Sequence, residues 1–151
     1  MFNSNEWIEQ GSSTDANKVA KKSHESITLR AEERSTFIPS IKIALGLGLC
    51  NRLGLKLGDY VKVFLNKSKD TFLVIKERGA ENGGKKLSGS QYANYLHFSF
   101  AAPAFSLNEL KIKKTVLAEF SLNKDGSILI KVDNLKINST TNNFNNFMPA
   151  Y

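Results

Sequence analysis

The stretch "LGLKLGDYVKVFL", residues Leu53 to Leu65, carries the clearest fold signal in the chain. An apolar run ends in a Gly-Asp corner, and from Tyr60 apolar and polar residues alternate with the period of a half-buried strand. The residues "TFLVIKE", Thr71 to Glu77, have the same β-rich composition, and the intervening "NKSKD" is typical of a tight turn. These residues therefore predict a turn that leads into a β-hairpin.

A weaker copy of this pattern occurs 55 residues later, as "NELKIKKTVLAEF", Asn108 to Phe120. In this frame, without a gap, Leu55 pairs with Leu110, Val61 with Val116 and Asp70 with Asp125. The second copy continues through "NKDG", a strong hairpin signal, into "SILIKV". We interpret the pattern as a duplicated hairpin unit, the alternative being a chance likeness between two ordinary hairpins of similar composition.

The duplication divides the chain into a first hairpin unit at 27–77, a glycine-rich linker at 78–91 and a second hairpin unit at 92–137. A unit of this size buries little apolar surface alone, so the two are expected to share one core. A helix around residues 38–55 is weakened by Gly46, Gly48 and Gly54, which leaves at most a short helical turn or two. The predicted fold is mainly β, with two related hairpin units packed as a pseudo-twofold small barrel or sandwich and little helix.

The two ends of the chain differ in composition from its centre. Residues 1–26 read as a flexible basic arm, and residues 138–151 as an Asn-rich flexible tail with isolated aromatic residues. Neither a signal peptide nor an apolar membrane span is recognisable, so a cytoplasmic protein without membrane contact is predicted. Cys50, the single cysteine, excludes an intramolecular disulfide framework, and its apolar neighbours predict a buried structural thiol in a reducing compartment.

The first unit resembles the swapped-hairpin DNA-binding domains of the AbrB, MazE and SpoVT-type regulators and antitoxins. In that family a strand leads into a Thr-hydrophobic-Pro corner, a short helix, a Leu-Gly-hydrophobic-x-x-Gly-Asp motif and a hairpin. Here Thr36 to Pro39 stand at the corner, and Leu53 to Asp59 match the second motif. The resemblance implies a fused pair of interleaved units that binds DNA through basic strands and loops. The chain departs from the pattern at Ile43, where the family has an Arg, and at Lys113-Lys114, which replace Gly-Asp in the second unit.

The charge of the chain favours an anionic partner. The net charge is +7 and the isoelectric point is about 9.5, values that suit nucleic acid, although a merely basic surface would have the same totals. Lysine and arginine side chains neutralise phosphates, and an exposed aromatic ring can stack on a base. The predicted nucleic-acid-binding residues are Arg30, Arg34 and Lys42 near the first strand and corner, Lys18, Lys21 and Lys22 on the arm, the cluster Lys111, Lys113 and Lys114, and Tyr95.

In "YLHFSF", Tyr95 to Phe100, the strand period places Tyr95, His97 and Ser99 on one face and Leu96, Phe98 and Phe100 on the other. Tyr95 and His97 are therefore candidates for stacking on bases, whereas core packing is preferred for Phe98 and Phe100. The chemistry predicted for this face is the binding of DNA or RNA, as in a transcription regulator, with duplex and single strand both left open.

The alternative function is a non-enzymatic protein-interaction or assembly module that uses the aromatic residues of its tails. The partners considered are a protein bound at the C-terminal tail and a second copy of the chain in a homo-oligomer. An enzyme is not predicted, because neither histidine stands at a recognisable motif spacing from a nucleophile or carboxylate, and no phosphate-binding loop or hydrolase motif occurs. No cofactor and no metal site are expected.

Overall fold

The structure is a computed structural model and describes residues 25–34, 38–89 and 94–137. The described chain is mainly β, as predicted, with two antiparallel sheets and one α-helix. All but the last two residues of the predicted basic arm, and the whole predicted tail, lie outside the described residues.

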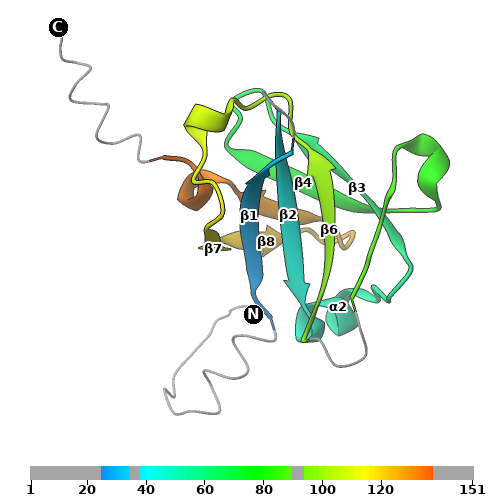
Figure 1. Ribbon diagram of the computed structural model, residues 1–151. Coiled ribbons are helices and arrows are strands. Elements are labelled where there is room, and N and C mark those ends of the chain that lie inside the picture. The colour runs from blue at the N-terminus through cyan, green and yellow to red at the C-terminus, as the bar shows by residue number, and fades with distance from the viewer. Residues whose placement is uncertain (1–24, 35–37, 90–93, 138–151) are drawn as a thin grey trace, which may run out of the picture.

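The two sheets take strands from both halves of the chain (Figure 1). The four-stranded sheet has the order β6-β2-β1-β7, with β6 at Tyr95–Ala101, β2 at Pro39–Gly46, β1 at Ile27–Glu33 and β7 at Thr115–Ala118. The five-stranded sheet has the order β5-β3-β4-β9-β8, with β5 at Lys85–Lys86, β3 at Tyr60–Leu65, β4 at Thr71–Glu77, β9 at Ile128–Lys131 and β8 at Phe120–Leu122. Since each sheet has two edge strands, the structure is a sandwich and not a closed barrel.

Alternation along the strands builds a single core between the sheets. Alternate residues of β1 up to Ala31, and of β2 and β6, are buried, and so are Phe72, Val74, Ile128 and Ile130 of the five-stranded sheet. Phe98 and Phe100 are buried as predicted, while Tyr95 on the opposite face is 41% exposed. The strands of one sheet cross those of the other in Figure 1, an arrangement in which a strand can pass from sheet to sheet at a corner.

The chain makes such a corner at Glu119, between β7 and β8. The residues on its two sides belong to different sheets, because β7 pairs with β1 whereas β8 pairs with β9. The carbonyl oxygen of Glu119 accepts a hydrogen bond from the N–H of Lys131 at 2.8 Å. The corner ties the second hairpin to both sheets.

The strand β2 was not predicted, and it corrects the interpretation of residues 38–55. Pro39 begins this strand instead of ending one, and Ile41, Ile43 and Leu45 alternate with smaller or polar residues along it. Proline is tolerated as the first residue of a strand because its missing N–H removes no bond from the interior of the ladder. The corner is thus followed by a central strand, whereas the family pattern has a helix there.

A short helix follows β2, in agreement with the one or two helical turns that were predicted. The helix α2 spans Leu47–Leu53 and ends at Gly54, whose φ of 73° lies in the left-handed region. Gly58 also has a positive φ, 91°, in the turn that the Asp59 side chain closes by accepting a bond from the N–H of Lys56 at 2.9 Å. Three 3-10 helices complete the described part of the chain: η1 (Ala80–Asn82), η2 (Leu107–Glu109) and η3 (Asp133–Leu135). None of the described helices has the length and apolarity to cross a membrane.

The two hairpins lie next to each other in the five-stranded sheet, where β4 pairs with β9. The gap-free frame of 55 residues holds at Gly58 and Lys113, which both have positive φ. It is wrong beyond β3, because the positive-φ turn residues Lys69 and Gly126 are 57 residues apart. Further on, the buried residue Phe72 corresponds to Ile128, 56 residues away. The second unit therefore has two more residues than the first before the turn, where β7 passes into β8, and one fewer within the turn.

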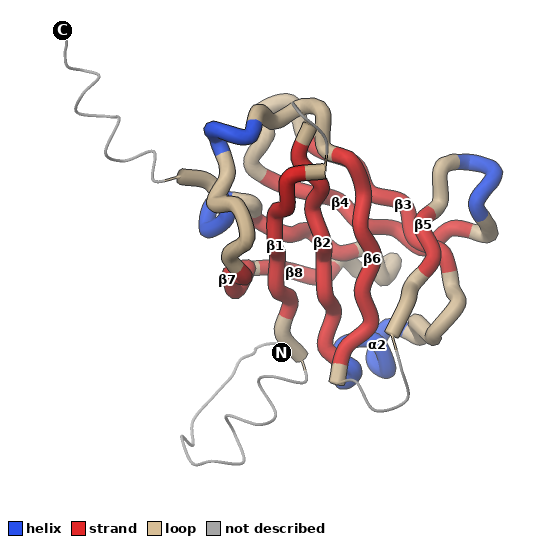
Figure 2. Tube along the Cα trace, in the orientation of Figure 1, coloured by secondary structure: helices blue, strands red, loops and turns tan. Residues whose placement is uncertain are grey.

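The glycine-rich stretch predicted as a linker contributes to both sheets (Figure 2). The strand β5 pairs with Tyr60 and Val61 of β3, and Ser88 forms an antiparallel bridge with His97 of β6. Between these two contacts Leu87 is fully buried. Its N–H donates to the carbonyl oxygen of Asp59 at 2.7 Å, which anchors the stretch to the turn before β3.

Candidate nucleic-acid interface

The outward surface of the four-stranded sheet carries three of the seven predicted site residues that the structure describes: Arg30, Lys42 and Tyr95. We call this surface the outer face. Its residues alternate with the buried ones of the same strands: Thr28, Arg30 and Glu32 of β1, Ser40, Lys42 and Ala44 of β2, Tyr95, His97 and Ser99 of β6, and Thr115 and Leu117 of β7. The front sheet in Figure 1 shows these strands side by side.

A row of polar side chains crosses all four strands at the middle of the outer face. Arg30 lies opposite Lys42 on β2 and opposite Thr115 on β7, and Lys42 lies opposite Ser99 on β6. Arg30 forms an ion pair with Glu32, and its guanidinium also donates to Oγ1 of Thr115 at 3.2 Å. Lys42, by contrast, has no carboxylate partner among the described residues.

Lys42, Tyr95 and His97 gather around Ala44. The Nζ atom of Lys42 lies 5.8 Å from the centroid of the Tyr95 ring, and the rings of Tyr95 and His97 are 5.9 Å apart. Ala44 lies opposite His97, and Gly46 lies opposite Tyr95. Because these two residues have little or no side chain, the lysine can extend across the sheet to the ring. The arrangement places a cation beside two exposed or half-buried rings.

The electrostatics of the cluster favour neutral His97. Partial burial, followed by the nearby positive charge of Lys42, lowers the pKa of His97 from its usual value. The imidazole is therefore uncharged at neutral pH and presents a flat ring. A neutral ring can stack on a base, whereas its protonated form would add charge for a phosphate.

The other predicted basic residues occupy different places. Lys113 and Lys114 directly precede β7, and the N–H of Lys113 donates to the carbonyl oxygen of Ala31 at 2.7 Å. Both side chains are exposed and next to Thr115 in the chain. Lys111 is half-buried and bonded through its N–H to Leu135 of η3, and Arg34 follows the far end of β1. Lys18, Lys21 and Lys22 lie outside the described residues.

Two members of the outer face were not predicted: Thr115, as a partner of Arg30, and Leu117, which is 62% exposed beside Thr28. Ser99 was placed on the face of Tyr95 and His97, but its position opposite Lys42 was not predicted. The alternation within β6 and β7 places these side chains outward. Their position opposite Lys42 and Arg30 depends on the order of the strands, which pairs residues from distant parts of the chain.

Reactive or metal-binding groups do not form a second centre in the described residues. Cys50 is buried as predicted, its Sγ donates to the carbonyl oxygen of Leu45 at 3.6 Å, and burial raises the pKa of its thiol. A buried thiol of this kind is a poor nucleophile. No group of three or more His, Cys, Asp or Glu side chains in the described ranges could hold a metal ion.

Comparison with known proteins gives no family or relative from which a function could be inferred. The chain matches no protein-family model, no curated protein and no solved structure.

Proposed function

We propose that the chain is a nucleic-acid-binding protein and that a single strand of DNA or RNA lies across the outer face. The observation that carries the proposal is the cluster of Lys42, Tyr95 and His97 around Ala44. Binding of single strands without strong sequence preference requires cations that follow the backbone and rings on which bases stack. The outer face offers both within one sheet.

The cations in and near the polar row of the outer face supply the phosphate contacts. Lys42 and Arg30 lie at the centre of this row, and Lys113 and Lys114 directly precede Thr115 in the chain. Each lysine alone would be an ordinary solvated side chain, but neighbouring cations on one face act together on a polyanion. A buried, free thiol at Cys50 suits the cytoplasm as the place where such a protein works.

A single strand is favoured over a duplex by the shape of the site. The only α-helix within the described ranges, α2, has seven residues, and its one basic residue, Arg52, is paired with Glu25. A recognition helix in the major groove presents several side chains to base edges, which α2 does not offer. A regulator of the AbrB type acting on duplex DNA is the second candidate, favoured by the positive φ of Gly54 and Gly58 in the matching motif.

The test is fluorescence anisotropy of labelled oligonucleotides, single-stranded and duplex, of equal length and across a salt series. We expect the single strand to bind more tightly, with an affinity that falls linearly in a log-log plot against salt. Tighter binding of the duplex would favour the regulator instead. No binding at low salt, or binding insensitive to salt, would contradict both.

A charge-matched pair of variants locates the site. The double variant Arg30→Gln/Lys42→Gln removes two charges from the outer face, and Lys124→Gln/Lys131→Gln removes two exposed charges from the second hairpin. The first pair should weaken binding and reduce the salt slope, whereas the second should leave both nearly unchanged. Equal effects from the two pairs would mean that only the net charge matters.

A further inference from the structure

The edges of the two sheets meet on one side of the sandwich, and the chain closes only one end of the gap. The segment from Lys85 to Ser88 pairs with Tyr60 and Val61 of β3 at one edge and with His97 of β6 at the other. Beyond these contacts, no described strand covers β3 from Lys62 to Leu65. The gap is therefore sealed at the β5 end and open at the other.

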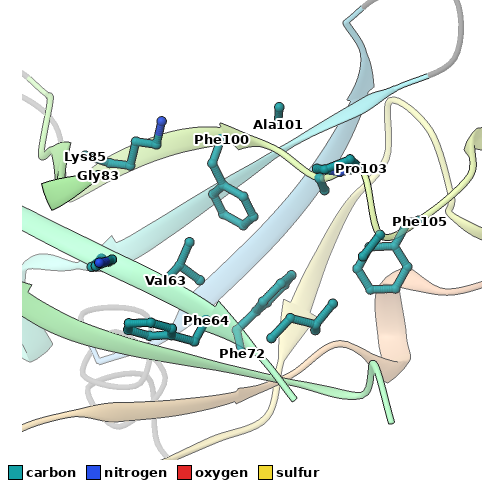
Figure 3. A pocket seen from close by; sticks show the side chains of 13 residues that line it. Val63, Phe64, Phe72, Gly83, Lys85, Phe100, Ala101, Pro103 and Phe105 are labelled. Atoms are coloured by element: carbon teal, nitrogen blue, oxygen red, sulfur yellow. The ribbon is translucent and has the colours of Figure 1, made fainter. Parts of the chain in front are cut away.

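An apolar groove of about 330 Å³ occupies the open end. Its floor consists of aromatic rings: Phe72 packs edge-on against Phe100 at 5.4 Å and against Phe105 at 6.4 Å. Figure 3 shows Phe100 directed toward Val63 and Phe72 from the opposite sheet, with Pro103 and Phe105 at one end and Lys85 at the other. The groove thus offers an apolar bed alongside a strand edge.

Two residues of β3 present backbone groups to this groove. The N–H of Asn66 donates to the carbonyl oxygen of Thr71, so Phe64 and Lys62 belong to the hydrogen-bonded pairs with β4. The backbone groups of Val63 and Leu65 then point away from β4, and they have no hydrogen-bond partner among the described residues. An open edge beside an apolar groove is the geometry in which an extended peptide adds a strand.

The described chain ends close to the same groove. The Nζ atom of Lys136 lies 5.9 Å from the ring centroid of Phe105, which lines the groove. Lys69, just after β3, lies 5.4 Å from that ring and donates to the carbonyl oxygen of Ala104. A segment that leaves Ile137 therefore meets the groove at its Leu65 end and would run antiparallel to β3.

The segment beyond Ile137 has the composition that this groove requires. Residues 138–151 contain no charged side chain and include Phe144, Phe147, Met148 and Tyr151. Their 14 residues span up to about 46 Å when extended, whereas the open edge of four residues needs only about 13 Å. Phe144 and Phe147 are three residues apart, so they point to opposite sides of a strand and one of them would enter the groove.

We propose that residues 138–151 dock on their own domain, as a strand added antiparallel to the outer edge of β3, with an aromatic side chain in the groove. This strand completes the closure that Lys85 to Ser88 begin. It lies at the edge of the sandwich, away from the outer face, so the proposal is separate from nucleic-acid binding.

The test is amide hydrogen exchange measured by NMR, because the docked strand would accept hydrogen bonds from the N–H groups of Val63 and Leu65. Three full-length chains are compared: the unaltered chain, Phe144→Ser/Phe147→Ser, and the control Asn145→Ser/Asn146→Ser. We expect exchange of Val63 and Leu65 to be slow in the unaltered and control chains, and faster by on the order of tenfold or more in the phenylalanine variant. The amides of Lys62 and Phe64, bonded to β4, should exchange slowly in all three.

Equal exchange of Val63 and Leu65 in the three chains would overturn the proposal. Protection that increases with protein concentration would assign the strand to a second copy of the chain and overturn docking on the same molecule. A synthetic peptide of residues 138–151 should restore protection when added to the phenylalanine variant, and a peptide carrying both serines should not. Since no nucleic acid is present, the result is independent of the proposed function.

Discussion

Arg30 and Lys42 lie directly opposite each other on β1 and β2, yet only Arg30 is paired with a carboxylate. Glu32 and Thr115 hold the guanidinium, whereas Lys42 contacts the ring of Tyr95 and no described acidic group. The charge of Lys42 is therefore the more available of the two for a phosphate. Arg30 and Lys42 are therefore predicted to contribute unequally to the binding of nucleic acid.

The first prediction is that Lys42→Gln weakens binding of a single-stranded oligonucleotide more than Arg30→Gln does. The loss of Lys42 should also lower the steepness of the salt dependence by about one phosphate contact. The variant Glu32→Gln should strengthen binding, because it frees the charge of Arg30. Anisotropy titrations at several salt concentrations measure all three effects. An Arg30→Gln variant that binds more weakly than Lys42→Gln would contradict this ordering.

The second prediction concerns the ring of Tyr95, which is 41% exposed on the outer face. Replacement by Ala should weaken single-strand binding by about 1 to 3 kcal/mol, the range for one stacked base, whereas Phe should retain most of the affinity. Because the side chain is exposed, thermal unfolding should change little in either variant. If Ala and Phe bind equally, the ring does not stack on a base.

The third prediction follows from the lowered pKa of His97. A bound phosphate favours the protonated imidazole, so binding should strengthen as the pH falls below about 6.5, the usual histidine value. His97→Gln should remove this increase in affinity at low pH. The matched variant His24→Gln changes the other histidine of the chain and should keep it. An affinity profile that is the same in all three chains would show that His97 does not meet the ligand.

The fold was predictable wherever short-range patterns decide it. The turn chemistry of "NKSKD" and "NKDG" and the alternation from Tyr60, Thr71 and Tyr95 predicted three strands whose first residues are those of β3, β4 and β6. The strand β2 was missed because its glycine-rich continuation into α2 obscured the alternation of Ile41, Ile43 and Leu45. The helix α2 begins directly where β2 ends, so the period of a strand and the period of a helix follow each other without a break in residues 39–53.

The sequence predicted which side chains of a single strand lie on the outer face, but not which residues of different strands lie next to each other. The pattern of β6 already placed Tyr95 and His97 on the face opposite Phe98. That Lys42 reaches Tyr95 and that Arg30 lies opposite Thr115 depends on strand pairing between segments more than 50 and 80 residues apart. Such pairings are set by how the two sheets share the core, which no local period records.

The fourth prediction is a loss of stability at the second hairpin turn. Bonds from Oγ and N–H of Ser127, at 2.6 and 2.9 Å, lower the pKa of Asp125. A carboxylate whose pKa is lower when folded stabilises the fold above about pH 3.9, and this contribution disappears as the pH falls through the folded-state pKa. Asp125→Asn should therefore reduce the free energy of unfolding at pH 7, and this loss should become smaller at acid pH, below about 3.9. Asp133→Asn, at an exposed position of η3, is the control, and denaturant unfolding at both pH values provides the measurement.

The last prediction concerns Lys113, which adopts a φ of 62° where the corresponding residue of the first unit is Gly58. A residue with a Cβ pays roughly 1 to 2 kcal/mol in the left-handed region, while glycine loses about 0.5 to 1 kcal/mol more entropy on folding. Lys113→Gly should therefore raise the free energy of unfolding by about 0.5 kcal/mol, as measured by denaturant titration. If Lys113 contacts a phosphate of the bound strand, as proposed, the same variant should bind a single strand more weakly despite being more stable. Lys69→Gly removes the same kind of strain at φ 59°, away from the outer face, and should leave binding unchanged, although it also loses the hydrogen bond from Lys69 to Ala104. A Lys113→Gly variant that is stabilised and binds as before would place this lysine outside the interface, and its strained backbone would then have no binding role.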